Sequence, residues 1–258
     1  MSFQRPTAKF FEGQTPPKLP MFSQDNIDWY NEQIRRCREG FEFRGTRMTG
    51  DQYWFHNICP MPVLEKDPKT GKLTGEFGYN YPYWSQADDY VFKQIEEAEQ
   101  AQLGFPLMTH RGAGKTQIIL SIGGKIFFLK KAKERMVHGI ISATNDDHAL
   151  PTFMKFSQLV KGVNKYHPSL ALDLIKDNTG EIIAGTQTNE DGKWNTELRA
   201  FMEKIVYGNS ADKTRGRRVD YLMYEEIGAW SPTDGATLKD CIAANRGIMW
   251  LGGKKVVS

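Results

Sequence analysis

The most constraining feature of this chain is the segment Thr-His-Arg-Gly-Ala-Gly-Lys-Thr at residues 109–116. An apolar run at 103–108 precedes it, and a helix-like apolar run beginning at Gln117 follows it. This order of strand, glycine-containing loop and helix is typical of a phosphate-binding loop. The segment therefore predicts an α/β fold in which the loop leads from a strand into a helix.

The residue types in the loop suit the binding of a nucleotide. Gly112 and Gly114 allow the backbone to turn its N–H groups inward, where the helix N-terminus adds partial positive charge. Lys115 is expected to bind the β- and γ-phosphates, and the hydroxyl of Thr116 to bind Mg²⁺. Thr109 replaces the first glycine of the usual pattern, so a surface turn that caps a helix is the alternative. The predicted ATP-binding residues here are Thr109, His110, Arg111, Gly112, Ala113, Gly114, Lys115 and Thr116.

A second chemical feature is the apolar run 221–224, at the end of the strand expected at 218–224, which is followed by the adjacent carboxylates Glu225 and Glu226. An apolar strand followed by acids is the Walker B arrangement, and ligands of open α/β sheets bind at the carboxyl ends of the strands. Glu225 is expected to hold Mg²⁺, and Glu226 to polarise the attacking water. Alone, the pair also fits the polar start of a loop. Its position after the Lys115 loop favours the catalytic interpretation.

Arginines supply a third feature. The basic loop 213–218 precedes the apolar run and contains Arg215 and Arg217, candidate arginine fingers toward a neighbouring subunit or contacts to nucleic-acid phosphate. An exposed loop without such a role fits equally well. Arg111 is the rival candidate, because a guanidinium inside the phosphate loop lies within reach of the γ-phosphate of its own chain.

Hydrophobic periodicity places the elements along the chain. We expect helices at 25–38, 87–102, 115–135, 149–163 and 237–245, a hairpin pairing 59–64 with 73–79, and strands at 105–109, 137–142, 181–185, 205–207, 218–224 and 247–251. Strands that alternate with helices imply a mostly parallel central sheet flanked by helices. The predicted fold class is an α/β P-loop NTPase of the additional-strand, catalytic-glutamate (ASCE) type, with an aromatic-rich N-terminal appendage.

Several local details follow from the same patterns. Asp25 or Asn26 is expected to cap the first helix and Gly40 to end it, and Pro151 is expected in a first helical turn. The apolar stripe of helix 87–102 is expected to comprise Tyr90, Val91, Ile95, Ala98 and Leu103. The basic cluster Lys125, Lys130, Lys131, Lys133 and Arg135 is interpreted as a solvated helix face. The predicted domains are an extended arm at 1–22, an appendage at 23–84 and an ATPase core at 85–258.

Composition sets broader limits. The net charge of +3 neither demands nor excludes a nucleic-acid partner. Three well-separated cysteines, Cys37, Cys59 and Cys241, predict reduced buried thiols rather than a disulfide framework or a zinc site. No long apolar segment or leader is evident, so we expect a soluble protein without a membrane partner.

Together these motifs resemble the ATPase domain of phage large terminases, the motors that pump DNA into procapsids. In that family the loop lacks its first glycine and carries an arginine three positions before Gly-Lys-[Ser/Thr], where Arg111 stands. The pattern Glu-Glu-x-Gly-x-aromatic matches 225–230, and Arg-Gly-Arg-Arg at 215–218 is similar to the family's segment before the strand. Residues 50–57 look like a segment that precedes the core in some phage terminases. The resemblance covers roughly residues 45–253.

The resemblance implies ATP hydrolysis with Mg²⁺, coupled to translocation of double-stranded DNA by a homo-oligomeric ring on a portal, with a small terminase subunit as a further partner. It also implies a virus-encoded protein of the host cell cytoplasm. The family's coupling motif cannot be assigned after the strand expected at 248–251. Its C-terminal nuclease domain is not encoded here, so nuclease activity is not expected from this chain.

Two other functions fit the motifs. A helicase-like or other nucleic-acid-dependent ATPase uses the same loop and acids, and a nucleotide-dependent assembly module would bind ATP with little hydrolysis. Adenine recognition is assigned to Gln86, which lies close to Tyr83 and Trp84 in sequence. An aromatic cluster with a surface glutamine is the alternative for that segment.

Overall fold

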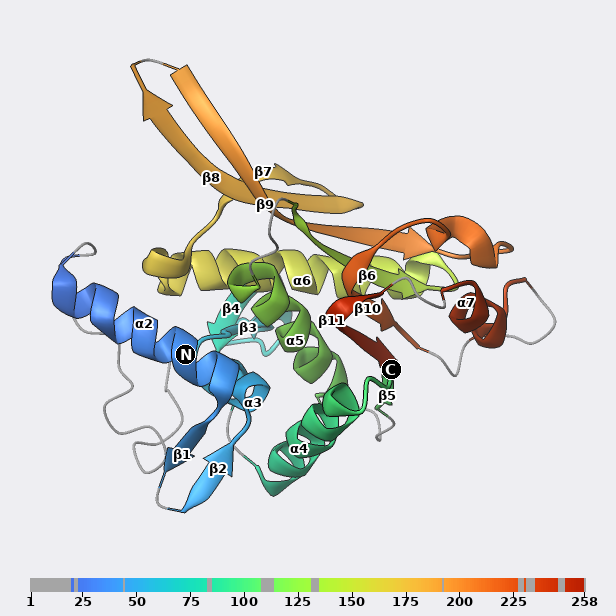
Figure 1. Ribbon diagram of the computed structural model, residues 1–258, viewed down its shortest axis with the longest axis horizontal. Helices are drawn as coiled ribbons and strands as arrows, with labels where there is room; N and C mark the ends of the chain where they lie inside the picture. Colours follow the sequence, from blue (N-terminus) through green and yellow to red (C-terminus); the bar gives the residue numbers. More distant parts are fainter. Residues whose placement is uncertain are drawn as a thin grey trace. The chain divides into compact units, whose positions relative to one another are not determined.

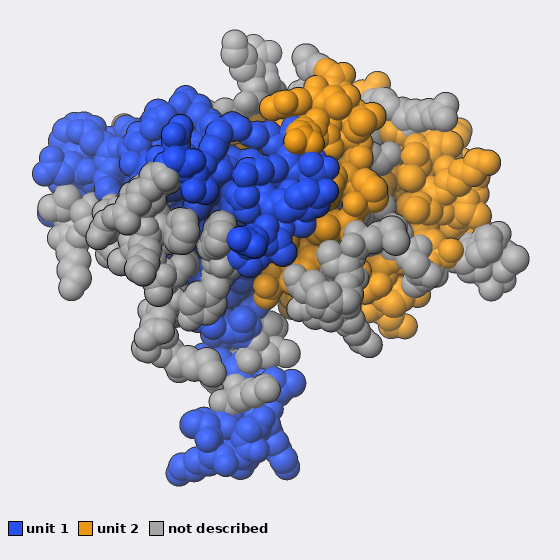
Figure 2. All heavy atoms as spheres, turned by 90° about the horizontal axis from the view of Figure 1, so that it is seen from below, with its two compact units in different colours: residues 1–96, 158–171 blue, residues 97–157, 172–258 orange. Residues whose placement is uncertain are grey.

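The computed structural model describes residues 20, 23–43, 45–82, 85–107, 114–130, 135–191, 193–226, 230, 235–245 and 249–257. The chain forms two compact units: unit 1 contains residues 1–96 and 158–171, and unit 2 contains residues 97–157 and 172–258 (Figure 2). The arm expected at 1–22 lies outside the described residues, apart from Pro20. The functional division into appendage and core stays a prediction.

Unit 1 is built mainly from the first third of the chain (Figure 1). Its elements are α2 (Gln24–Glu39), β1 (Phe41–Phe43), β2 (Thr46–Met48), α3 (Gly50–Asn57), β3 (Met61–Lys66), β4 (Leu73–Asn80) and most of α4 (Gln86–Gln100). β3 and β4 pair antiparallel with Met61 opposite Asn80, which confirms the expected hairpin. Ser23, not Asp25 or Asn26, caps α2, because its hydroxyl accepts a hydrogen bond from the Asn26 N–H.

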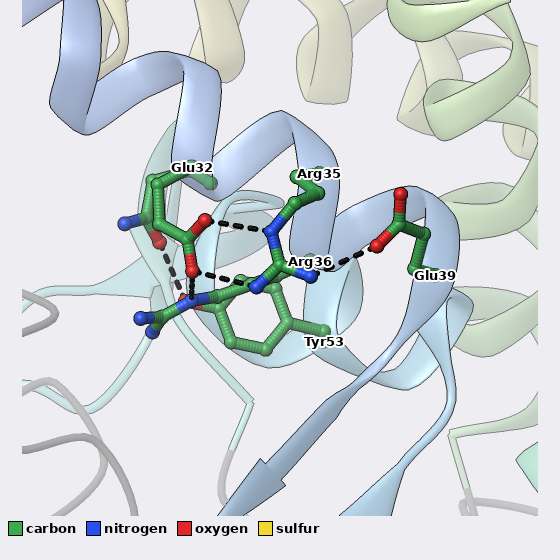
Figure 3. Close-up of polar contacts among 6 residues, drawn as sticks. Glu32, Arg35, Arg36, Glu39 and Tyr53 are labelled. Atoms are coloured by element: carbon green, nitrogen blue, oxygen red, sulfur yellow. Dashed lines mark hydrogen bonds and ion pairs between the residues drawn. The ribbon is translucent and has the colours of Figure 1, made fainter.

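An ionic cluster joins α2 to α3 (Figure 3). Glu32 accepts hydrogen bonds from Arg35 (2.7 Å) and Arg36 (2.6 Å), and Arg36 lies over the Phe41 ring, 4.1 Å from its centroid. The hydrogen bond from Arg35 is the largest reason that the pKa of Glu32 falls to about 2. Arg36 also donates to the Tyr53 hydroxyl at 3.4 Å. Every residue of α3 is buried, so this contact anchors a core helix.

α4 departs from the expected stripe. Its buried residues are Phe92 and Ile95, whereas Tyr90 and Leu103 are each 66% exposed. The helix begins at Gln86 and ends at Gln100, and Gln102 takes a positive φ of 56°. The helix therefore stops before Leu103, which cannot join its apolar face. The expected stripe was wrong in these two residues.

Unit 2 contains a seven-stranded mixed sheet in the order β5-β11-β10-β6-β9-β8-β7. The strands are β5 (Phe105–Pro106), β6 (Val137–Ala143), β7 (Asp173–Asp177), β8 (Glu181–Glu190), β9 (Lys193–Val206), β10 (Val219–Tyr224) and β11 (Met249–Val257). β5, β11, β10, β6 and β9 pair in parallel, and β8 and β7 continue the sheet antiparallel. The expected strand at 247–251 was too short, because β11 continues to Val257 through two glycines.

The strand β10 lies near the middle of this sheet, and all six of its residues are buried. This explains its apolar run at 221–224, since both faces of the strand are covered. β11 lies between β5 and β10, so one strand separates the strand before the phosphate loop from the strand before the two glutamates. Parallel pairing brings the carboxyl ends of β5, β11, β10 and β6 to the same edge of the sheet.

The helices of unit 2 are α5 (Lys115–Leu129), α7 (Leu238–Ala244) and the first half of α6 (Asp146–Tyr166), with 3₁₀ turns at 168–170 in unit 1 and 211–214 in unit 2. α5 ends at Leu129, so the prediction of a helix to residue 135 was wrong. α6 begins three residues before the expected start, and the Asn145 side chain accepts from the His148 N–H (3.1 Å) as a helix cap does. Pro151 therefore lies beyond the first turn.

Part of the basic cluster after α5 is not a solvated helix face. Lys130 and Arg135 both form ion pairs with the fully buried carboxylate of Asp220 in β10, at 3.0 and 2.6 Å. Burial by itself raises the pKa of Asp220, but hydrogen bonds from Arg135, the His138 N–H and Lys130 outweigh it and lower the pKa. Lys131 and Lys133 lie outside the described residues.

The strands β8 and β9 form a long hairpin, although short strands around a loop were expected. Their register runs from Glu181 opposite Glu203 to Glu190 opposite Lys193, and the hairpin extends away from the rest of the sheet (Figure 1). Residues 193–198 are all exposed, including Trp194 at 67%. Apolar periodicity ends at Gly185, but cross-strand backbone hydrogen bonds extend the ladder beyond it.

Two further expectations concern the chain as a whole. Cys37, Cys59 and Cys241 are free and buried, as expected. Among the helices that the structure describes, none has both the length and the apolar character needed to cross a lipid bilayer.

Candidate functional site

The first part of the site is the N-terminus of α5. Gly114 occupies the N-cap position with φ 79° and ψ 10°, a left-handed conformation that favours glycine. Lys115 and Thr116 are the first two residues of the helix. The preceding loop residues, Thr109, His110, Arg111, Gly112 and Ala113, lie outside the described residues, so their contacts with phosphate stay predictions.

The second part is Glu225, which follows β10 and is only 4% exposed. Its N–H donates to the Ser142 carbonyl of β6 (2.7 Å), and its own carbonyl accepts from the indole N–H of Trp230 (3.0 Å). These backbone contacts hold Glu225 at the carboxyl edge of the sheet. The backbone of Glu225 is thus fixed through both its N–H and its carbonyl group.

The two parts meet through the Glu225 carboxylate. Thr116 Oγ1 donates to Glu225 Oε1 at 3.3 Å, across 109 residues of sequence. Thr152 Oγ1 of α6 donates to the same oxygen at 3.2 Å. The structure therefore brings together the predicted metal-binding pair Thr116 and Glu225, and it adds a hydroxyl that was not predicted.

A pocket of about 860 Å³ surrounds this contact. Its lining comes from the start of α5, from the first half of α6 and from the two glutamates, and comprises Gly114, Lys115, Thr116, Gln117, Asp147, His148, Pro151, Thr152, Lys155, Glu225 and Glu226. Such a volume lies within the range of small-molecule sites in proteins. All of these residues belong to unit 2.

The sequence did not predict that residues of α6 form one wall of the pocket. Asp147, Pro151 and Lys155 recur every four residues and so lie on one helix face, with His148 and Thr152 beside them. The available signal was the position of this helix directly after β6, because such a helix starts at the carboxyl edge of the sheet.

Glu226 lies next to the buried glutamate but in a different environment. It is exposed, it lines the pocket, and its φ of 49° is in the left-handed region. A non-glycine residue in that conformation costs of order 1–3 kcal/mol and is concentrated at functional sites. The two adjacent carboxylates therefore have different surroundings, since Glu225 is buried and Glu226 is exposed.

An aromatic cluster supports the end of β10. Trp230 packs against Tyr207 and Tyr224, with ring centroids 5.6 and 5.8 Å apart. Asn245 donates to the Tyr207 hydroxyl (2.7 Å) and to the Tyr224 hydroxyl (2.8 Å), so the buried hydroxyls are satisfied. Burial raises the pKa of Tyr207, which keeps this hydroxyl neutral. The cluster thus packs Trp230, whose indole binds the Glu225 carbonyl, against the end of β10.

The candidate arginine fingers lie near the amino end of β10, away from the pocket. Arg217 forms an ion pair with Glu203 of β9, and Arg215 pairs with Asp212 at 2.8 Å. Neither lines the pocket of its own chain. A contribution to a neighbouring subunit stays a prediction, and Arg215, which is 71% exposed, is the more accessible of the two.

Two assignments have no further support from the described residues. Gln86 is the exposed first residue of α4 in unit 1, and its contact with adenine stays a prediction. Among the described residues there is no group of three or more His, Cys, Asp or Glu side chains that could hold a metal ion.

Comparisons with known proteins find remote likeness only. No protein-family model matches the chain, and no curated protein matches it. Among solved structures, the chain is similar to the large terminase ATPase domain of Thermus phage P74-26 and to an arginine-to-alanine mutant of that domain. Both are 14% identical, with TM-scores of 0.40 and 0.41, and the match covers 66% of this chain and 68% of theirs. No family membership follows from likeness at this level.

Proposed function

We propose that unit 2 is an ATPase that hydrolyses Mg²⁺-ATP. The observation that carries this proposal is the hydrogen bond between Thr116 and Glu225, which joins the residue after Lys115 to the acid after β10 inside the pocket. A surface turn that merely caps a helix would have no reason to contact a buried carboxylate. The strand order supports the proposal, because β11 separates β5 from β10 as expected for the additional-strand class of P-loop NTPases.

The side chains fit the groups that such a reaction needs. A threonine hydroxyl and a carboxylate are the oxygen ligands that Mg²⁺ prefers, and Lys115 supplies a cation beside them for phosphate oxygens. When bound, Mg²⁺ would neutralise charge on the β- and γ-phosphates. Thr116 and Glu225 would hold it, and the amides of residues 112–116 would bind phosphate.

The remaining residues have distinct proposed roles. Glu226 accepts a proton from the attacking water, because it is the exposed carboxylate of the pair and lines the pocket. Lys115 stabilises negative charge on the phosphates, and Arg111 adds a second cation from the loop. Glu225 already accepts two hydroxyl hydrogen bonds through Oε1, which suits it to a metal-holding role rather than to proton transfer.

We further propose that hydrolysis drives double-stranded DNA translocation in a packaging terminase. Sequence supports this step: Arg111 stands where phage terminases carry an arginine, and residues 225–230 match their pattern after the Walker B strand. In this proposal the domain works in a homo-oligomeric ring on a portal, and Arg215 or Arg217 completes the site of a neighbour. Isolated subunits would then hydrolyse ATP slowly, because these arginines would be missing from each site.

Phosphate release by wild type and Glu226→Gln, with and without double-stranded DNA, tests the proposal. We expect DNA-stimulated turnover in wild type and a loss of at least about a hundredfold in the variant, with ATP binding retained. Unchanged turnover in the variant would remove Glu226 as the base. Tight ATP binding without turnover at any protein concentration would instead indicate an assembly module, and stimulation by single-stranded nucleic acid alone would indicate a helicase-like ATPase.

A further inference from the structure

Thr152 makes a contact that the proposed reaction does not by itself require. This residue of α6 is 4% exposed, and its Oγ1 donates to Glu225 Oε1 at 3.2 Å. The same oxygen accepts from Thr116 Oγ1 at 3.3 Å. Hydroxyls from two different helices therefore converge on one carboxylate oxygen, and only Thr116 belongs to the phosphate-loop motif.

The position of the Thr152 hydroxyl is set by the core and not by Glu225. Its neighbours Phe153 and Phe156 are fully buried, so this part of α6 cannot rotate without opening the core. A threonine inside a helix commonly donates to a carbonyl of the preceding turn. Here the hydroxyl proton goes to Glu225 instead, which makes α6 a fixed support for the carboxylate.

Two donors on one oxygen restrict the carboxylate in a way that one donor cannot. A glutamate side chain has three rotatable bonds, and a single hydrogen bond leaves the plane of its carboxylate free to turn. With donors from α5 and α6, Oε1 is held between the two helices. The position of this oxygen is then set before any ligand binds.

We propose that Thr152 is a positioning residue that orients Glu225 for a divalent cation. The inference rests on the proposed function, because it concerns the metal-holding role of Glu225. In this proposal α6 contributes to the affinity of the site for Mg²⁺-nucleotide. This contribution is separate from phosphate binding by the loop. Loss of the hydroxyl removes the donor that α6 supplies to Glu225 and weakens the metal-dependent part of binding.

The test measures how nucleotide affinity depends on Mg²⁺. A fluorescent ATP analogue is titrated onto the full chain in a Glu226→Gln background, with and without Mg²⁺, and the Mg²⁺ concentration that gives half of the affinity gain is determined. Thr152→Val keeps the branched shape and removes the donor. We expect its Mg²⁺ midpoint to rise about five- to tenfold, with unchanged affinity in the absence of metal. Thr152→Ser restores the donor and should return the midpoint to within about twofold of its original value.

Ser157→Ala is the matched control. Ser157 lies on the same helix and is buried, but its hydroxyl donates to Asp177 (2.8 Å) and not to the pocket. This variant should lower thermal stability without moving the Mg²⁺ midpoint. An equal shift in Ser157→Ala and Thr152→Val would mean that only the stability of α6 matters, and the inference would fail.

The outcomes separate this inference from the function on which it rests. Metal-dependent binding in the Glu226→Gln background, together with an unchanged midpoint in Thr152→Val, overturns the role of Thr152 alone. Absence of any Mg²⁺-dependent binding before Thr152 is changed overturns the proposed function as well. Thermal unfolding without nucleotide verifies that each variant is folded, and Thr152→Ala, which also lacks the donor, should repeat the shift of Thr152→Val.

Discussion

Trp230 donates its indole N–H to the backbone carbonyl of Glu225, five residues earlier in the chain, at 3.0 Å. The ring also packs against Tyr207 and Tyr224, and it is only 8% exposed. One side chain therefore fixes the backbone of the buried glutamate and covers the strand that precedes it. This contact links the packing of the core directly to the geometry of the pocket.

Trp230→Phe should lower both stability and turnover. The variant keeps an aromatic ring but leaves the Glu225 carbonyl without its donor, which costs about 1–3 kcal/mol of unfolding free energy. Displacement of Glu225 should reduce turnover roughly tenfold. Urea denaturation and phosphate release measure the two effects. Trp194→Phe, at an exposed position on the hairpin, should change neither.

The two adjacent glutamates should separate in their effects on binding. Glu225→Gln removes the charge of the buried carboxylate and should weaken Mg²⁺-dependent nucleotide binding about tenfold or more. Glu226→Gln changes an exposed side chain and should leave binding within about twofold, because its proposed role is in proton transfer. Both variants should stop turnover. Equal losses of affinity would contradict the division of roles.

Gly114→Ala should act through backbone conformation and not through crowding. The nearest atom to an added Cβ is 3.7 Å away, but φ is +79°. The expected cost is about 1–2 kcal/mol in stability, with weaker nucleotide binding because Lys115 and Thr116 follow directly. Gly216→Ala is the control, since its φ is +81° and nothing lies within 4 Å of the added Cβ. It should lose similar stability and keep its nucleotide affinity.

Asp220→Asn should destabilise the fold strongly. The fully buried carboxylate pairs with Lys130 and Arg135. Loss of its charge should lower the free energy of unfolding by about 3 kcal/mol, because both cations lose this partner. The folded-state pKa of Asp220 is lowered. Its contribution is therefore present above the unfolded pKa of about 3.9 and is lost as pH falls through the folded value.

Denaturant titrations at several pH values measure the direction of this pH dependence of stability. Wild type should lose stability below about pH 4, and Asp220→Asn should lack this part of the decline. Asp212→Asn, at an exposed ion pair with Arg215, should cost less than about 0.5 kcal/mol at any pH. A similar loss in both variants would mean that burial does not decide the strength of the Asp220 pairs.

The parts of the site that could be predicted are those whose chemistry is contiguous in sequence. Lys115 and Thr116 follow glycines at a helix start, and Glu225 follows four apolar residues at the end of a strand whose faces are both buried. Thr152 could not be predicted, since a threonine inside an amphipathic helix has no local signal for its partner. Its role depends on the register of α6 against β10, which is set by packing across 73 residues of sequence.

The errors in the fold have local physical causes. Tyr90 and Leu103 were assigned to a buried stripe, but α4 ends before Leu103 and buries Phe92 instead. The strands of the hairpin β8–β9 were predicted too short, at 181–185 and 205–207, because the outer residues of the hairpin are polar. Pairs such as Gln187 opposite Thr196 still form, since the backbone ladder does not require an apolar face. Polar patterning alone therefore underestimates the length of a protruding ribbon.

The outer half of that hairpin has a consequence for how this chain can change over time. Its residues from Lys193 to Leu198 are exposed, so substitutions there remove little buried surface and leave the pocket at the other end of the fold intact. By contrast, each residue of β10 is buried and constrained by its neighbours on both sides. The outer half of the ribbon can therefore diverge in sequence more freely than β10 while the chemistry stays the same.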